Sequence, residues 1–324
     1  MDAKRRAMVV GDLAVLLVAF IWGLTNVVIR DALDGITPFW FCFLRFVVAS
    51  AALMLLFGRR AFAMTRRAKV RGMLTGVVFS LAYLSGAVGL LYTTAGNQSF
   101  IVSMSVVFVP LCVWFLTKKF PGWHVMVSVA LCLAGLCGLM LDGNFRVNPG
   151  DALSAFAMLC ITGYILLVEK FVAGEDACGL ACWQAAGTMI CSALCALAFE
   201  PVPAEIGRAA WLAVIYAGTI GCALTLVLQT AAQKFTSPTH VAILLSTSGI
   251  FGSLLGVVFI GEPMTWRIFI ASALIFAGVI IVEAVPALRK KKLTRPRSRL
   301  PRRRHKGMKR ARLSRERRAL MCVS

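Results

Sequence analysis

The chain has 324 residues, of which 59% are hydrophobic and only 15% are charged. A soluble globular domain typically carries about 25% charged residues, so this composition argues against a soluble enzyme or binding module and favours an integral membrane protein. The net charge of +21 does not describe the whole chain, because 17 of its 35 Lys and Arg residues lie between positions 289 and 318.

Apolar stretches of membrane-spanning length follow one another from near the N-terminus. A spanning helix needs roughly 20 mostly apolar residues, and the connections between the stretches are short. The first stretch follows Lys4-Arg5-Arg6 but has no small-residue cleavage site, so we interpret it as a span rather than a signal peptide. We predict ten transmembrane helices, at about 11–29, 37–57, 73–93, 97–116, 125–141, 150–169, 179–198, 209–233, 239–260 and 266–284.

The basic residues between the spans predict the orientation. With the N-terminus inside, the inner connections and the N-terminus hold 13 Lys and Arg residues and the outer connections hold 4. Basic residues are enriched on the cytoplasmic side of membrane proteins. An even number of spans then places both termini inside, in the cytoplasmic (inner) membrane.

Short motifs recur between the two halves of the chain. Gly11-Asp12-Leu13 opens the first span and Gly150-Asp151-Ala152 opens the sixth, while Trp123 corresponds to Trp266, at an offset of roughly 139 to 143 residues. Five spans per repeat is an odd number, so the halves should have opposite orientations, an architecture typical of secondary transporters. We therefore predict an all-α integral membrane fold with two inverted five-helix repeats, at 11–141 and 150–284.

Neutral polar side chains form stripes within several spans. In the eighth span Thr225, Gln229 and Gln233 are four apart and share a helix face. Such residues either line a water-filled path or hydrogen-bond between helices, and for this stripe both interpretations stay open. We predict that the substrate path is lined by Trp22, Asn26, Tyr83, Gln98, Ser105, Thr225, Gln229 and Thr247.

Other small and polar residues favour helix packing. Thr188 and Ser192 repeat the fourfold spacing in the seventh span, where we expect interhelical contacts. In the ninth span Gly252 and Gly256 are small residues four apart, which lets another helix approach closely. The eleven cysteines include no Cys-x-x-Cys pair and lie mostly inside apolar runs, so we expect packing roles, with no metal and no cofactor.

Arg45 is the one Lys or Arg in the interior of an apolar span. It is a site for an anionic substrate, a partner of a helix terminus, or a structural anchor bonded to backbone carbonyls. No carboxylate lies in the middle of a span, which argues against a membrane-buried acid as a proton carrier. The sequence also lacks the HExxH, Walker-type and GxSxG motifs, so we expect no enzymatic activity.

The basic segment 288–324 has no hydrophobic periodicity and is predicted to be a disordered cytoplasmic tail. Its charge should hold it near anionic lipid on the inner membrane surface, at about 1 kcal/mol per basic residue close to the surface. Binding to nucleic acid would be nonspecific.

Three segments in order resemble the drug/metabolite transporter superfamily, specifically its EamA-type ten-helix transporters. The segments contain Trp22-Gly23 with Arg45-Phe46, then Pro110, and then Ser237-Pro238-Thr239 with Gly261-Glu262. The resemblance covers residues 11–284. It implies export of small metabolites, such as amino acids or related compounds, by alternating access around a cavity between the halves.

The chain departs from the family pattern at two places. The family often has Glu-Pro inside the ninth span, where this chain has Ser248-Gly249. The first-half counterpart of Gly261-Glu262 is Thr117-Lys118 or Lys118-Lys119, with no acid. The first departure removes a carboxylate suited to ion coupling or gating. Alternatives to a transporter of a small-molecule solute are a membrane-embedded enzyme acting on a lipid-type substrate and a membrane anchor acting through its basic tail. A homodimer is also left open.

Overall fold

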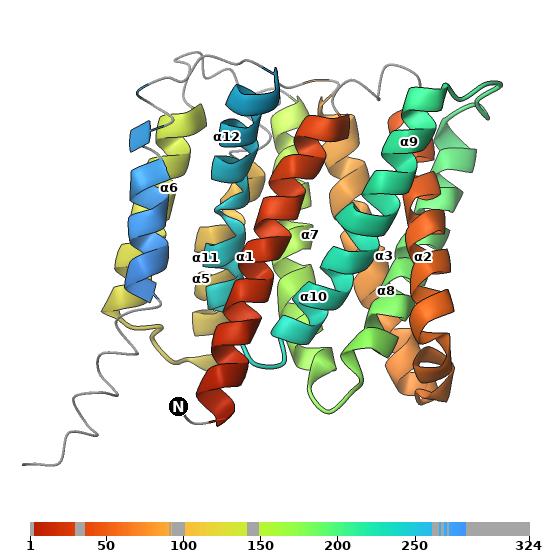
Figure 1. Cartoon of the computed structure of the whole chain (residues 1–324). Helices are drawn as coiled ribbons and strands as arrows, with labels where there is room; N and C mark the ends of the chain where they lie inside the picture. Colours follow the sequence, from red (N-terminus) through yellow and green to blue (C-terminus); the bar gives the residue numbers. More distant parts are fainter. Residues whose placement is uncertain are drawn as a thin grey trace, which may run out of the picture. The chain divides into compact units, whose positions relative to one another are not determined.

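The computed structural model describes residues 3–29, 36–90, 92, 101–140, 149–260, 266, 269–270 and 272–282. These residues form helices and turns, with no strand in the described ranges (Figure 1). All of them belong to the unit Met1–Val282. The basic tail, predicted at 288–324, lies outside the described residues.

Six helical segments are long and apolar enough to cross a bilayer, and three shorter apolar helices accompany them within the described ranges. The prediction of an all-α integral membrane fold is therefore confirmed. The helices are α1 (Ala3–Ile29), α2 (Pro38–Ala63), α3 (Arg66–Leu90), α5 (Ser105–Thr117), α6 (Trp123–Met140), α7 (Pro149–Val172), α8 (Ala177–Phe199), α9 (Arg208–Tyr216), the π-helix η2 (Ala217–Leu224), α10 (Thr225–Ala232), α11 (Pro238–Leu245) and α12 (Ser248–Ile260).

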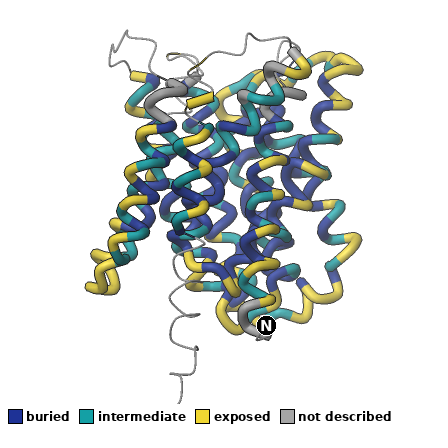
Figure 2. The backbone as a smooth tube through the Cα atoms, turned by 60° about the vertical axis from the view of Figure 1, so that its left-hand side comes forward, coloured by how far each residue is buried: buried dark blue, intermediate teal, exposed yellow. Residues whose placement is uncertain are grey.

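The outward faces of the helices carry large apolar side chains. Leu55 is 86% exposed, Phe115 75% and Phe199 74%. Figure 2 shows buried residues along the interior of the helix bundle and exposed residues on its outer faces and at the helix ends. A protein in water would not leave so much apolar surface open, so these faces fit a lipid environment.

Glycines let α3 and α8 approach until their backbones touch. A Cβ added at Gly76 would lie 2.1 Å from the carbonyl oxygen of Gln184, and one at Gly187 would lie 2.4 Å from that of Met73. Small residues replace the hydrophobic effect as the main packing device inside membranes, because lipid is as apolar as the side chains. The α3–α8 pair is thus fixed by backbone shape.

The close approach predicted for the ninth span occurs against α1. A Cβ added at Gly23 would lie 2.7 Å from the backbone nitrogen of Gly252. Figure 1 shows α1 and α12 side by side, and they pack against each other. Gly252 therefore provides the helix contact that its spacing from Gly256 predicted.

A carboxylate from the second half caps the start of α2. Glu200, which follows α8, accepts hydrogen bonds from the backbone nitrogens of Phe39 and Trp40, each at 3.1 Å, and from the Thr37 hydroxyl at 2.5 Å. Free N–H groups and the helix dipole make a helix N-terminus favourable for an anion. The cap joins the beginning of α2 to the end of α8, the two helices that pack along each other.

Three predicted continuous spans are interrupted, which corrects the sequence prediction. The fourth span has a turn at Met104, the ninth has a turn at 246–247, and the eighth changes from α-helix to the π-helix η2 and back. In the ninth span the hydroxyl of Ser246 donates to the Ile243 carbonyl at 2.7 Å and that of Thr247 to the Leu244 carbonyl at 2.6 Å. Hydroxyls that bond to nearby carbonyls compete with regular helix geometry.

Candidate functional site

The interruptions in the fourth and ninth spans occupy equivalent positions. Met104 donates its backbone N–H to Ile101 at 3.1 Å, and Thr247 donates to Leu244, also at 3.1 Å. Both bonds span three residues instead of four. The helices that follow, α5 and α12, have 13 residues each, and α12 starts 143 positions after α5 (248 against 105). The offset equals that between Trp123 and Trp266.

Corresponding interruptions in two halves are a recognised pointer to the binding region of a secondary transporter. The half-helix before the second interruption, α11, packs against α5, which follows the first. Ser105, at the start of α5, is half-buried, and Thr247 is fully buried. The structure thus places these two predicted path residues at the two interruptions.

Gln229 lies on α10 with no hydrogen-bonding partner. Its side chain is 1% exposed, and neither its amide oxygen nor its amide nitrogen has a partner within the described residues. An unpartnered buried amide costs about 1–3 kcal/mol, so this residue is expensive as a packing element. Thr225, one turn earlier, is also buried but donates its hydroxyl to Gly221 at 2.6 Å and Cys222 at 3.1 Å.

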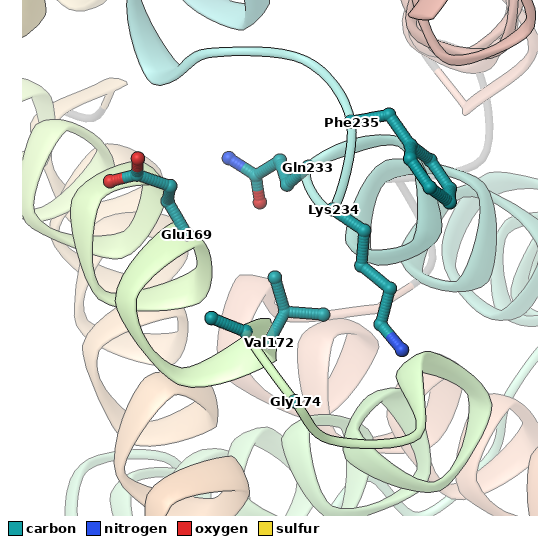
Figure 3. Close-up of a pocket in the computed structure, with 7 residues that line it drawn as sticks. Glu169, Val172, Gly174, Gln233, Lys234 and Phe235 are labelled. Atoms are coloured by element: carbon teal, nitrogen blue, oxygen red, sulfur yellow. The ribbon is translucent and has the colours of Figure 1, made fainter. Parts of the chain in front are cut away.

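A pocket of about 340 Å³ opens at the end of α10, lined by Glu169, Val172, Ala173, Gly174, Gln233, Lys234 and Phe235. Figure 3 shows Glu169 and Gln233 on opposite sides of the opening and the Lys234 amine directed toward the loop that holds Gly174. Gln233 is 3% exposed and donates to the Ile165 carbonyl at 3.2 Å, while its own amide oxygen has no partner among the described residues. Gln229 lies one helical turn deeper along the same helix.

Arg45 lies inside the bundle with aromatic side chains around its guanidinium. The guanidinium carbon is 4.2 Å from the ring centroid of Tyr83, 5.3 Å from that of Phe46 and 5.6 Å from that of Phe41. Arg45 is 6% exposed, and its Nε has no hydrogen-bonding partner among the described residues. One terminal nitrogen has a weak contact with the Cys42 sulfur at 3.9 Å. In the described part of the chain it pairs with no carboxylate.

Tyr83 belongs to an aromatic cluster formed by α2, α3 and α7. Its ring is edge-on to Phe79 at 4.8 Å and to Phe46 at 6.2 Å, and Phe79 stacks on Tyr164 at 4.4 Å. Tyr164 is 1% exposed, and its hydroxyl has no hydrogen-bonding partner within the described ranges. Sequence reasoning missed Tyr164, although a tyrosine in the middle of an apolar span was a signal for it.

The polar side chains of α8 are used in packing. Thr188 donates to the Gly76 carbonyl at 2.9 Å and to the Gln184 carbonyl at 3.0 Å. Ser192 is 3.0 Å from the Ser80 hydroxyl and 3.4 Å from the Cys42 sulfur. These contacts agree with the packing role expected for Thr188 and Ser192.

The remaining predicted path residues are not all brought to one place. Trp22, on α1, is half-buried against the apolar core. Asn26 lies in the last turn of α1, and its side chain is outside what the structure describes. Gln98 is outside the described residues. The structure therefore assembles no complete lining from the predicted set.

A hydrogen bond that the sequence did not indicate joins α1 to the turn between α10 and α11. The Thr236 hydroxyl donates to the Asp12 carboxylate at 2.8 Å, and both side chains are buried. A Cβ added at the neighbouring Gly11 would lie 2.7 Å from the same hydroxyl. The Gly11-Asp12 motif therefore has a packing function at the start of the first half.

No group of three or more His, Cys, Asp or Glu side chains within the described ranges is arranged to hold a metal ion. The nine cysteines for which the structure describes side chains are free thiols, and Cys42, Cys132, Cys182 and Cys222 are buried. These residues contribute apolar volume to the helix contacts.

The chain is similar to known membrane transporters along most of its length. The model of the EamA-like transporter family matches residues 9–141 and again residues 148–284. A protein of Archaeoglobus fulgidus named uncharacterized transporter is 31% identical over 272 residues, which is 84% of this chain and 85% of the relative. The Bacillus subtilis protein named uncharacterized transporter YwfM is 26% identical over 294 residues, covering 86% of this chain and 95% of that protein.

A solved crystal structure has the same arrangement of helices. It superposes with a TM-score of 0.73 and covers 89% of this chain and 99% of its own, at 20% sequence identity. At that identity the likeness establishes a shared fold and carries no information about the solute.

Proposed function

Because the chain belongs to the EamA-like transporter family, we propose that it exports small polar metabolites, such as amino acids or related compounds, across the cytoplasmic membrane. The family and the names of the relatives support transport as the activity and give no support for an enzyme. The class of solute, the direction of transport and the transport mechanism are what we propose beyond transport itself.

The observation that carries it is the unpartnered amide of Gln229. A packing role would leave this side chain hydrogen-bonded to another helix, as Thr188 is. A solute-binding role requires the opposite, because the amide must be available to a passing polar group and to the water that replaces it. The pocket at Gln233 lies one helical turn away from Gln229, and we propose that it is the entrance to this position.

The proposed mechanism is alternating access. The interruptions at Met104 and 246–247 divide their spans into segments that can tilt separately, which a continuous helix cannot do at small cost. The Gly23–Gly252 contact brings the backbones of α1 and α12 together, and we propose that the two helices move against each other there. Trp22, Asn26, Tyr83, Gln98, Ser105, Thr225, Gln229 and Thr247 are the residues proposed along the path.

We further propose that both termini are cytoplasmic. In that orientation the pocket of Glu169, Gln233 and Lys234 faces the cytoplasm, since α7 ends and α11 begins on the same side as the N-terminus of α1. An inward-facing pocket suits a protein that collects its solute from the cytoplasm.

Metabolite profiling tests the proposal. Medium and cytoplasm would be compared between cells that produce the protein and cells with an empty vector. We expect a small set of polar solutes enriched in the medium only when the protein is present. Profiles that match the empty vector in both compartments, with the protein verified in the membrane, would contradict export.

The basic tail distinguishes this function from a membrane anchor. We propose that 288–324 lies on anionic lipid and takes no part in transport, because its charge suits the lipid surface. Deleting the tail should leave export per folded molecule within about twofold of the intact protein, as expected for a contact that adds affinity for the membrane only. An export rate abolished by the deletion would favour the anchor instead.

A further inference from the structure

Arg45 is a buried cation within the membrane-spanning helix α2. It is 6% exposed and has no carboxylate partner within the described residues. Its recorded contacts are the rings of Phe41, Phe46 and Tyr83 and the sulfur of Cys42. Among the residues that the structure describes, its Nε donor has no acceptor. A structural anchor bonded to backbone carbonyls, the alternative raised by the sequence, does not have this pattern of contacts.

The position of Arg45 in the fold also points to a function. A Cβ added at Gly218 would lie 2.7 Å from the Arg45 carbonyl oxygen, so the π-helix η2 touches the backbone of α2 at this residue. The π-helix η2 has 8 residues, and π-helical geometry inside an α-helix is frequent at functional sites. Arg45 lies about 10 Å along α2 from its start at Pro38, at 1.5 Å per residue, and therefore below the helix end.

Charges within membrane-spanning segments are costly and are usually paired or functional. Aromatic faces attract a guanidinium through their quadrupoles, but they offer no hydrogen-bond acceptor in the ring plane. An arginine with a free donor edge is well suited to an anion with two coplanar oxygens, because the guanidinium fork matches that geometry.

We propose that Arg45 binds the carboxylate of the transported solute, with Tyr83, Phe46 and Phe41 against the apolar part of the same molecule. The inference rests on the proposed transport function and specifies its substrate class as small carboxylate-bearing compounds. A carboxylate is favoured over a phosphate because a phosphate carries more than one negative charge near neutral pH. Apart from Arg267, at the very start of the tenth predicted span, no second Lys or Arg lies within an apolar span to balance it.

Thermal unfolding of the purified full-length protein in detergent tests the binding directly. The probes are three carboxylates of increasing apolar size, acetate, benzoate and 3-phenylpropanoate, with benzamide and 3-phenylpropanamide as neutral isosteres. At 10 mM we expect at least one carboxylate to raise Tm by about 3 °C and the amides to leave it unchanged. Equal shifts with acid and amide, or no shift with any carboxylate, would overturn the proposal.

Variants locate the effect. Arg45→Gln should abolish the carboxylate-dependent shift and Arg45→Lys should retain a smaller one, since a lysine keeps the charge but not the fork. Arg208→Gln, which removes an exposed arginine in the first turn of α9, is the matched control and should keep the full shift. A carboxylate shift that survives in Arg45→Gln would contradict the assignment.

The stability of the variant without a probe excludes a structural explanation. Arg45→Gln removes a charge without an ionic partner, so its own Tm should be no lower than that of the intact protein. If Arg45 is an anchor, the variant will unfold at a clearly lower temperature. The acid–amide comparison on the intact protein does not depend on any variant.

Export measurements separate this inference from the proposed function. If carboxylates bind at Arg45 and no solute is exported, the transport proposal fails and the binding site stands. If the exported solutes lack a carboxylate and Arg45→Gln exports them as well as Arg208→Gln does, transport stands and the role of Arg45 is wrong.

Discussion

Two parts of the same helix bundle treat buried polar side chains in opposite ways. Along α8, Thr188 and Ser192 are bonded to α3 and α2. Within the described ranges, the amide of Gln229 on α10 and the Nε of Arg45 on α2 have no hydrogen-bonding partner, although both residues are buried.

The difference distinguishes polar groups that stabilise the fold from polar groups that serve transport. Satisfied polar groups between close-packed helices add stability and specify which helices pair. Unsatisfied ones reduce stability, and a protein retains them where they do something that an apolar residue cannot. The α3–α8 pair is therefore expected to determine stability, and Arg45 on α2 and Gln229 on α10 are expected to determine transport.

The largest effect is expected where α3 touches α8. Replacing Gly76 by Val places new atoms against the Gln184 carbonyl, which already lies 2.1 Å from a Cβ at this position. Overpacking of this kind costs about 3 kcal/mol or more, and Tm should fall by roughly 10 °C. Thermal unfolding in detergent measures it. Gly163→Ala is the control, since its Cβ would meet nothing closer than Val78 at 3.9 Å. An equal fall in Tm for Gly163→Ala would contradict the claim that the backbone contact at Gly76 stabilises the fold.

Gln229→Leu should lower the export rate without lowering the thermal stability of the protein. Leucine has a similar volume and no unsatisfied amide, so Tm should stay level or rise by a few degrees. The initial rate of solute appearance in the medium, at equal membrane abundance, should fall about tenfold, as expected for the loss of hydrogen bonds worth about 1.4 kcal/mol. A variant with lower Tm and normal export would place Gln229 with the packing residues.

Thr188→Val is the corresponding change on the structural side. It preserves shape and removes the hydrogen bonds to Gly76 and Gln184. The loss is about 1 kcal/mol, so Tm should fall by about 2–4 °C while export per folded molecule is unchanged. Reduced export without reduced stability would show that α8 also lines the path.

The smallest effect is expected at the cap of α2. Glu200→Ala removes the acceptor for the backbone nitrogens of Phe39 and Trp40. Capping is worth about 1 kcal/mol, less where water screens it, so Tm should fall by only about 2 °C. Asp176→Ala removes the corresponding cap of α8, at Gly179, and should have a similar effect. If Glu200→Ala has a much lower Tm than Asp176→Ala, Glu200 stabilises the contact between α2 and α8 by more than capping.

The spans could be predicted from the sequence because hydropathy over about 20 residues is a local property. Their interruptions could not be placed in the same way. The run Ser246-Thr247-Ser248-Gly249 was a signal for a break, but whether its hydroxyls bond to their own helix or to another depends on neighbours distant in sequence. The repeat boundaries at 11–141 and 150–284 stay predictions.

The candidate site could be predicted in part. Arg45 stood out as the lone basic residue in a span, and Gln229 by its spacing from Thr225 and Gln233. Their lack of partners could not be predicted, because it is a property of every helix around them. The cap that Glu200 provides at the start of α2 could not be predicted either, because Glu200 and Phe39 are more than 160 positions apart in sequence.

The most direct test of the account is efflux from proteoliposomes. The solute identified by profiling would be loaded into vesicles that contain intact protein, Gln229→Leu or Thr188→Val in equal folded amounts. The account predicts a rate about tenfold lower for Gln229→Leu and a rate within about twofold of the intact protein for Thr188→Val, since its hydrogen bonds stabilise packing only. Equal rates for Gln229→Leu and the intact protein would contradict the claim that the unpartnered amide belongs to the transport path.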